Sequence, residues 1–207
     1  MKILLTIIYS ILIPIIYITY LYGLKKKGTT PSAITWFIWM VAGVINAITY
    51  YHLISGNIFK YMIAILTAIC ASFVFFYTLF KGSFKKLNEV DSVIILLLVC
   101  VGIFWFTSKN QRNTNLLLQL VYIVSFVPIA YNVWFKNATE YIVPFLIALF
   151  AYSISIITIL LEWNGDWAEI AYPVANGIIG NGLVVVVIYK KQKNNLKRQR
   201  KYEKTNI

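Results

Sequence analysis

Seven apolar stretches, separated by short polar segments, run along the whole chain. An α-helix rises 1.5 Å per residue, so about 20 apolar residues cross the roughly 30 Å hydrocarbon core of a bilayer. The stretches cover residues 3–24, 34–54, 61–80, 92–106, 116–135, 143–161 and 170–189. The fourth is short, and we expect it either to tilt or to extend through Glu89 and Ser108. The pattern predicts an all-α membrane protein with seven transmembrane helices and no cleaved signal peptide.

Composition excludes a soluble domain, and the basic residues predict the orientation. The 207 residues are 60% hydrophobic and 13% charged, with a mean hydropathy of +0.74. Of the 19 Lys and Arg residues, fifteen lie in loops 25–27 and 81–86, at Lys136 and in the tail after 189; four flank the other ends of the stretches. Because basic loops stay in the cytoplasm, we expect a plasma-membrane protein with the N-terminus outside and the C-terminus inside. We interpret the tail, residues 191–207, as a solvated topology anchor and expect no nucleic-acid partner.

One phrase occurs twice, as Pro14-Ile15-Ile16-Tyr17 and as Pro128-Ile129-Ala130-Tyr131. Each copy lies inside an apolar stretch that opens a run of three. This predicts a 3+1+3 arrangement of parallel three-helix bundles: 1–86, a linker helix within 87–113, and 114–190. Proline removes a backbone donor and kinks a helix, so we expect Pro14 and Pro128 to act as hinges.

This arrangement resembles the PQ-loop/SWEET (MtN3) superfamily of seven-helix membrane transporters. Residues 121–136 with Pro128 look like its PQ-loop helix, and Pro173-Val174-Ala175-Asn176 looks like its proline- and asparagine-bearing third helix. The chain differs by having Ile after both prolines, and Thr67 where the first repeat would carry asparagine. The resemblance implies a solute site between the bundles, with Asn176 as a solute-binding residue and Thr67 at the matching position.

Polar and aromatic residues on two helices complete the candidate site. Trp39 and Asn46 share one face of the second helix, which suits a polar solute with a flat ring. Tyr152 and Ser155 form the corresponding face of the sixth helix. We expect Trp36, on the same face as Trp39, to be an anchor at the membrane interface.

Ionisable residues are predicted to lie outside the membrane interior, with the cluster Glu162, Asp166 and Glu169 in a solvated loop. Proton-coupled carriers usually hold such a group at mid-membrane. The sequence therefore favours passive diffusion. We identify no catalytic constellation, metal-ligand spacing or cofactor motif, so an enzyme is not predicted.

The prediction is a facilitator that passes a small neutral polar solute, such as a sugar, by alternating access. One alternative is a vitamin-precursor carrier resembling PnuC, whose tryptophan-rich walls fit Trp36 and Trp39. Another is a non-transporting membrane receptor or scaffold with a basic cytoplasmic tail. The expected partners are the solute and the lipid bilayer, and the sequence leaves a homo-oligomer open.

Overall fold

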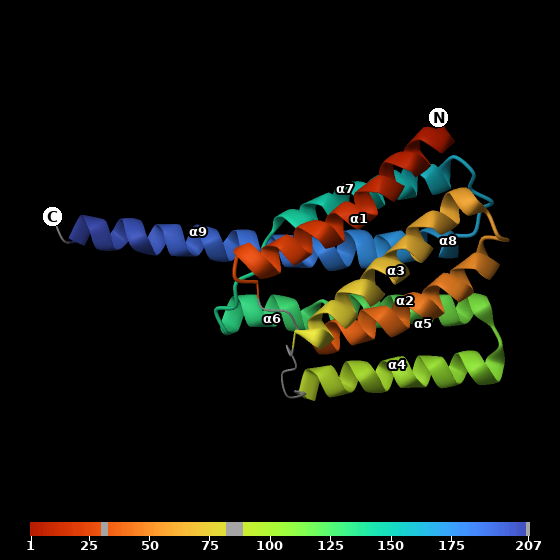
Figure 1. Ribbon diagram of the computed structural model, residues 1–207, viewed down its shortest axis with the longest axis horizontal. Helices are drawn as coiled ribbons and strands as arrows, with labels where there is room; N and C mark the ends of the chain where they lie inside the picture. The colour runs from red at the N-terminus through yellow and green to blue at the C-terminus, as the bar shows by residue number, and fades with distance from the viewer. Residues whose placement is uncertain (30–32, 82–88, 206–207) are drawn as a thin grey trace.

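Helices form the whole of the secondary structure in the part of the chain that the computed structural model describes, residues 1–29, 33–81 and 89–205 (Figure 1). They are α1 (Lys2–Lys26), α2 (Ala33–Leu53), α3 (Ile58–Phe80), α4 (Glu89–Ser108), α5 (Gln111–Ser125), α6 (Val127–Phe135), α7 (Val143–Leu160), α8 (Ala168–Tyr172), the π-helix η1 (Pro173–Gly180) and α9 (Asn181–Thr205). Together they make seven spans long and apolar enough to cross a membrane, as predicted. The fourth extends through Glu89 and Ser108, as one of the two expectations had it.

The helices pack in a consistent order. α3 lies against both α1 and α2, and the run from α8 to α9 lies against both α5–α6 and α7. Between these two groups, α1 packs on α7, α2 on α5, and α3 on α7. α4 packs on α5 and α2 and forms one edge of the bundle in Figure 1.

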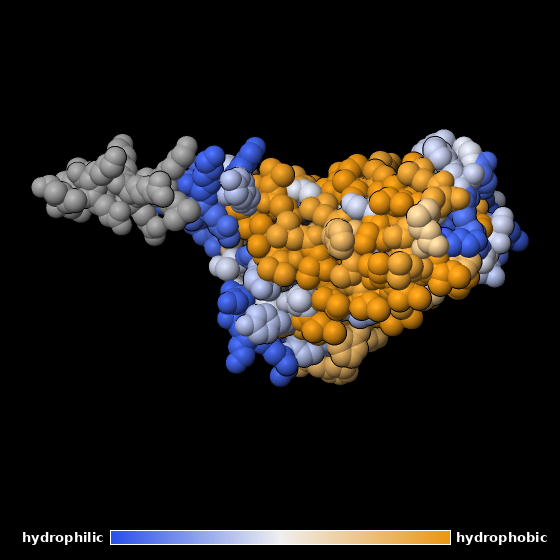
Figure 2. All heavy atoms as spheres, turned by 90° about the horizontal axis from the view of Figure 1, so that it is seen from above, coloured by the Kyte–Doolittle hydropathy of each residue, from blue (hydrophilic) through white to orange (hydrophobic). Residues whose placement is uncertain are grey.

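The outer surface has a broad apolar belt between two polar ends (Figure 2). Large side chains such as Phe73, Leu96 and Phe150 are exposed on it. Such an apolar surface is stable only against lipid, so the chain is a multi-pass membrane protein. We call the end with the α2–α3, α4–α5 and α7–α8 loops the Lys60 end and the opposite one the tail end, where α9 projects beyond the other helices (Figure 1).

The two proline phrases have different local structures. α1 continues as one helix through Pro14. In contrast, α5 ends at Ser125 and α6 begins at Val127, with Pro128 in its first turn. A third irregularity follows Pro173, where the chain forms a π-helix of eight residues. π-helical turns are rare and occur frequently at functional sites.

Some predictions fall outside the described residues. Lys85, Lys86 and the boundary between 86 and 87 lie in the undescribed segment 82–88. The side chains of residues 196–207 in the basic tail are likewise outside the description, although the α9 backbone continues to Thr205.

Candidate functional site

A cavity lies between the two helix groups. Its volume is about 50 Å³. Side chains from α1, α2, α3, α5, α7, η1 and α9 contribute to its wall. The lining residues are Ile13, Ile16, Tyr17, Tyr20, Trp36, Trp39, Thr67, Ala71, Tyr122, Phe126, Pro144, Phe145, Ala148, Tyr152, Asn176 and Asn181. No charged side chain of the described residues lines it, so the wall offers no ionic partner of either sign.

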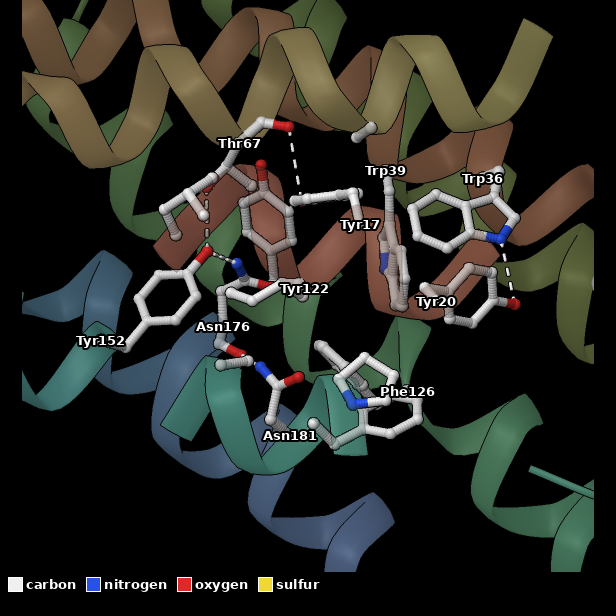
Figure 3. Close-up of a pocket in the computed structure, with 16 residues that line it drawn as sticks. Tyr17, Tyr20, Trp36, Trp39, Thr67, Tyr122, Phe126, Tyr152, Asn176 and Asn181 are labelled. Carbon is white, nitrogen blue, oxygen red and sulfur yellow. Dashed lines mark hydrogen bonds between the residues drawn. The ribbon is translucent and has the colours of Figure 1, made fainter. Parts of the chain in front are cut away.

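Aromatic rings form one side of this cavity (Figure 3). The Trp36 and Trp39 rings meet edge to face with centroids 4.8 Å apart, and Trp39 lies 4.9 Å from Phe126. The Trp36 indole donates a hydrogen bond to the Tyr20 hydroxyl (3.3 Å), and the Trp39 indole donates to Ser125 (2.6 Å). These bonds fix the orientation of both indoles.

The expectation that Trp36 anchors the protein at the membrane interface is wrong. Its side chain is only 3% exposed and packs against Tyr17 and Tyr20 of α1. Trp36 occupies the inward face of α2, one turn before Trp39. Hydropathy places a tryptophan near a helix end, but only the neighbouring helix decides whether the ring meets lipid or protein.

Hydroxyl and amide groups form the other side of the cavity. The Asn176 side-chain nitrogen donates to the Tyr152 hydroxyl (2.6 Å) and, at 3.5 Å, to the Tyr172 hydroxyl. Tyr152 also bonds Thr67 (3.2 Å) and Tyr172 (3.1 Å). Because buried polar groups are costly unless they are bonded, this network holds the four side chains in fixed positions.

The π-helix brings Asn181 to the same cavity. Residues five apart lie roughly 140° apart around an α-helix, but the wider i to i+5 turn returns them to one face. The Asn181 side-chain nitrogen accordingly donates to the backbone carbonyls of Asn176 (2.7 Å) and Gly177 (3.1 Å). In Figure 3, Asn181 lies between Asn176 and Phe126.

Two glycines let this helix approach its neighbours. A Cβ added at Gly177 would lie 2.2 Å from Tyr152 Cγ, and one at Gly180 would lie 2.2 Å from Phe126 Cε2. Both glycines are therefore positions of close helix packing. Because these glycines have no side chains, the Tyr152 and Phe126 rings have room to line the cavity.

The structure therefore brings together four of the six predicted binding residues, Trp39, Thr67, Tyr152 and Asn176. Asn46 and Ser155 are buried elsewhere. The Asn46 oxygen accepts hydrogen bonds from Asn115 (3.0 Å) and Gln119 (3.4 Å) of α5. Ser155 lies one turn after Tyr152 but is not part of the cavity wall. Of the two proposed hinges, neither Pro14 nor Pro128 lines the cavity.

The predicted solvated acidic loop is wrong for Glu169. Its carboxylate pairs with Lys60 at 2.7 Å, and the two side chains are 1% and 3% exposed. Lys60 also donates to the backbone carbonyl of Glu162 (2.7 Å), and Asn164 donates to Glu169 (3.0 Å). The cause is tertiary: at the Lys60 end, the side chain of Lys60 in the first turn of α3 reaches Glu169 in the short helix α8.

Several residues of the site were not among the predicted ones. Tyr17, Tyr20, Tyr122 and Phe126 line the cavity, and Tyr172 completes the polar network. One signal was present, because Tyr17 belongs to the repeated proline phrase. The matching Tyr131, however, is 48% exposed, so the phrase alone does not identify a lining residue.

Compared with protein-family models, with curated proteins and with solved structures, the chain matches none.

Proposed function

We propose that this protein is a SWEET-like facilitator that passes a small, neutral, polar solute between two three-helix bundles. One observation carries the proposal: a cavity between the helix groups pairs an aromatic wall with a short hydroxyl and amide network, without a charged lining side chain among the described residues. Solute sites typically combine apolar walls with a few convergent polar groups. An aromatic face suits the carbon–hydrogen face of a sugar ring, and the amide and hydroxyls suit its polar edge.

Helix order supports a 3+1+3 repeat. In each group the third span lies between the first and the second, and α4 lies outside both groups. The first and third spans of both groups run in the same direction along the bundle (Figure 1). This is the relation expected for parallel repeats, whose axis runs along the membrane normal.

Alternating access would be needed for a solute to enter. Ligand pockets commonly measure about 300–1,000 Å³, and this cavity is far smaller. The break between α5 and α6 at Pro128 is one place where the helix could bend, and Pro14 in α1 is the corresponding position. Opposed rocking of the two groups would widen the cavity toward one side at a time.

Flux into proteoliposomes across a panel of sugars, amino acids and nucleosides tests the proposal. We expect uptake of at least one neutral solute, and Asn176→Ala should lower it roughly tenfold or more, because a group that fixes the polar network is lost. Ser153→Ala is the matched control, since Ser153 is exposed and bonds only its own helix. Folded protein that moves none of the solutes would contradict the proposal.

The tryptophan pair favours a second candidate, a carrier of a vitamin precursor resembling PnuC. Trp36 and Trp39 meet edge to face beside the cavity, and a flat heterocycle could stack on such rings. Thermal stabilisation of the purified protein by nicotinamide riboside, without stabilisation by sugars, would select this candidate.

Orientation in a plasma membrane can be tested separately. In a chain without Cys70 and Cys100, a cysteine at Ser108 (Lys60 end) should react with an impermeant thiol reagent from outside. A cysteine at Thr139 (tail end) should react only after permeabilisation. Both positions are exposed. The reverse pattern would overturn the proposed topology.

A further inference from the structure

Among the amide and indole groups that line the cavity, the donors are used within the protein and the acceptors are not. Four lining side chains carry N–H groups: Trp36, Trp39, Asn176 and Asn181. Every one of these side-chain nitrogens donates within the protein. The indoles donate to Tyr20 and Ser125, while the two amides donate to tyrosine hydroxyls and to backbone carbonyls.

The amide oxygens remain. Neither Asn176 Oδ1 nor Asn181 Oδ1 accepts a hydrogen bond from the described residues. For Asn181 the choice of oxygen and nitrogen is dictated by chemistry, since only the nitrogen can donate to the carbonyls of Asn176 and Gly177. Its oxygen therefore lies away from those carbonyls, beside the cavity that Asn181 lines.

The π-turn explains why two such oxygens occur together. Asn176 lies within η1 and Asn181 directly follows it, so the widened turn holds both amides on the cavity face. The Asn181 amide is locked, because both of its partners are backbone carbonyls and it cannot rotate to offer a donor without breaking two bonds. The Asn181 oxygen is therefore preorganised to accept a hydrogen bond, while the Tyr122 hydroxyl, which has no partner among the described residues, can donate or accept one.

On this basis, and resting on the proposed solute site, we infer that Asn181 is a second solute-contacting residue. Together with Asn176 it selects ring-shaped solutes whose polar edge donates hydrogen bonds. A solute that fits between the rings but offers only acceptors would leave both amide oxygens unpaired in a buried site. Sites built around hydrogen bonds reject analogues that lack the matching group.

Matched analogues test this inference by binding, independently of transport. The probes are D-glucose with each of its monodeoxyfluoro analogues, and nicotinamide with N,N-dimethylnicotinamide. Each replacement keeps the ring and removes one or more donors. Dissociation constants are measured from thermal stabilisation of the purified full-length protein. We expect a parent compound to bind and at least one donor-deficient analogue to bind roughly tenfold more weakly or worse.

Substitutions at Asn181 test whether this residue causes the discrimination between parent and analogue. Leucine is similar in size to asparagine but has no amide. In Asn181→Leu, the ratio of the dissociation constants of the sensitive analogue and its parent should fall toward one. Asn181→Ser replaces this variant if the leucine variant does not fold. Ser72→Ala, which loses only a bond to its own helix, should keep the wild-type ratio. The inference is overturned if donor-deficient analogues bind within about twofold of their parents, if the ratio survives in the Asn181 variant, or if no probe binds. A parent that binds but is not transported would instead refute the facilitator proposal and leave the recognition intact.

Discussion

The ammonium of Lys60 lies 2.7 Å from a carboxylate oxygen of Glu169, and the two side chains are 3% and 1% exposed. The pair joins the first turn of α3 to α8, two elements more than 100 residues apart in sequence. Breaking a buried pair leaves an uncompensated charge. We expect Lys60→Met to destabilise the protein by about 3–5 kcal/mol, measured by thermal unfolding in detergent.

Two further variants sharpen that experiment. Lys60→Met combined with Glu169→Leu should recover much of the loss, because no buried charge remains. Lys2→Met is the control, since Lys2 is 44% exposed in its pair with Glu162. This substitution should lower the free energy of unfolding by about 0–1 kcal/mol. Equal losses for the exposed and the buried pair would show that Lys60 and Glu169 are not a buried pair.

Glycine substitutions test the close packing of η1. Gly177→Ala and Gly180→Ala place a Cβ 2.2 Å from the rings of Tyr152 and Phe126, so we expect a loss of about 1–3 kcal/mol or more for each. Gly102→Ala and Gly182→Ala are matched controls, because no atom lies closer than 3.9 Å to either added Cβ. These should be neutral or slightly stabilising. Thermal unfolding of all four variants provides the comparison.

Tyr152→Phe tests the polar network. The hydroxyl accepts from Asn176 and bonds Thr67 and Tyr172, so its removal leaves buried polar groups without a partner. We expect a loss of about 1–3 kcal/mol in stability, together with reduced flux of any transported solute. Tyr131→Phe, at an exposed ring, should change neither quantity. Unchanged stability in the Tyr152 variant would mean that the network does not hold the site together.

Acid should weaken the loop contacts at the Lys60 end. Hydrogen bonds from Lys2 and Asn57 hold the pKa of Glu162 below its ordinary value of 4.5. A carboxylate with a lowered folded-state pKa contributes stability above its unfolded pKa, and that stability is lost as the pH falls through the folded-state value. The melting temperature should therefore fall below about pH 4.5. In Glu162→Gln, the melting temperature should fall less in acid. If the melting temperatures of this variant and of the wild type depended on pH in the same way, Glu162 would not have this role.

Much of the fold could be predicted because hydropathy acts locally. Each apolar stretch became a spanning helix, and the short fourth stretch extended to Glu89 and Ser108. Helical spacing also placed Trp39 and Asn46 on one face of α2, and both residues are turned into the bundle. The outcome for each of these residues depended on its neighbour: Trp39 met the cavity, whereas Asn46 met the amides of α5.

The sequence by itself determined the seven spans, the polar ends and the proline positions, because backbone hydrogen bonding in lipid forces apolar stretches of that length into helices. Only the tertiary structure decided that Glu169 is buried against Lys60 and that Trp36 lies inside. It also decided that a π-turn aligns Asn181 with Asn176. These features depend on which helices become neighbours and how widely one turn is wound, and neither property is contained in the hydropathy of a single segment.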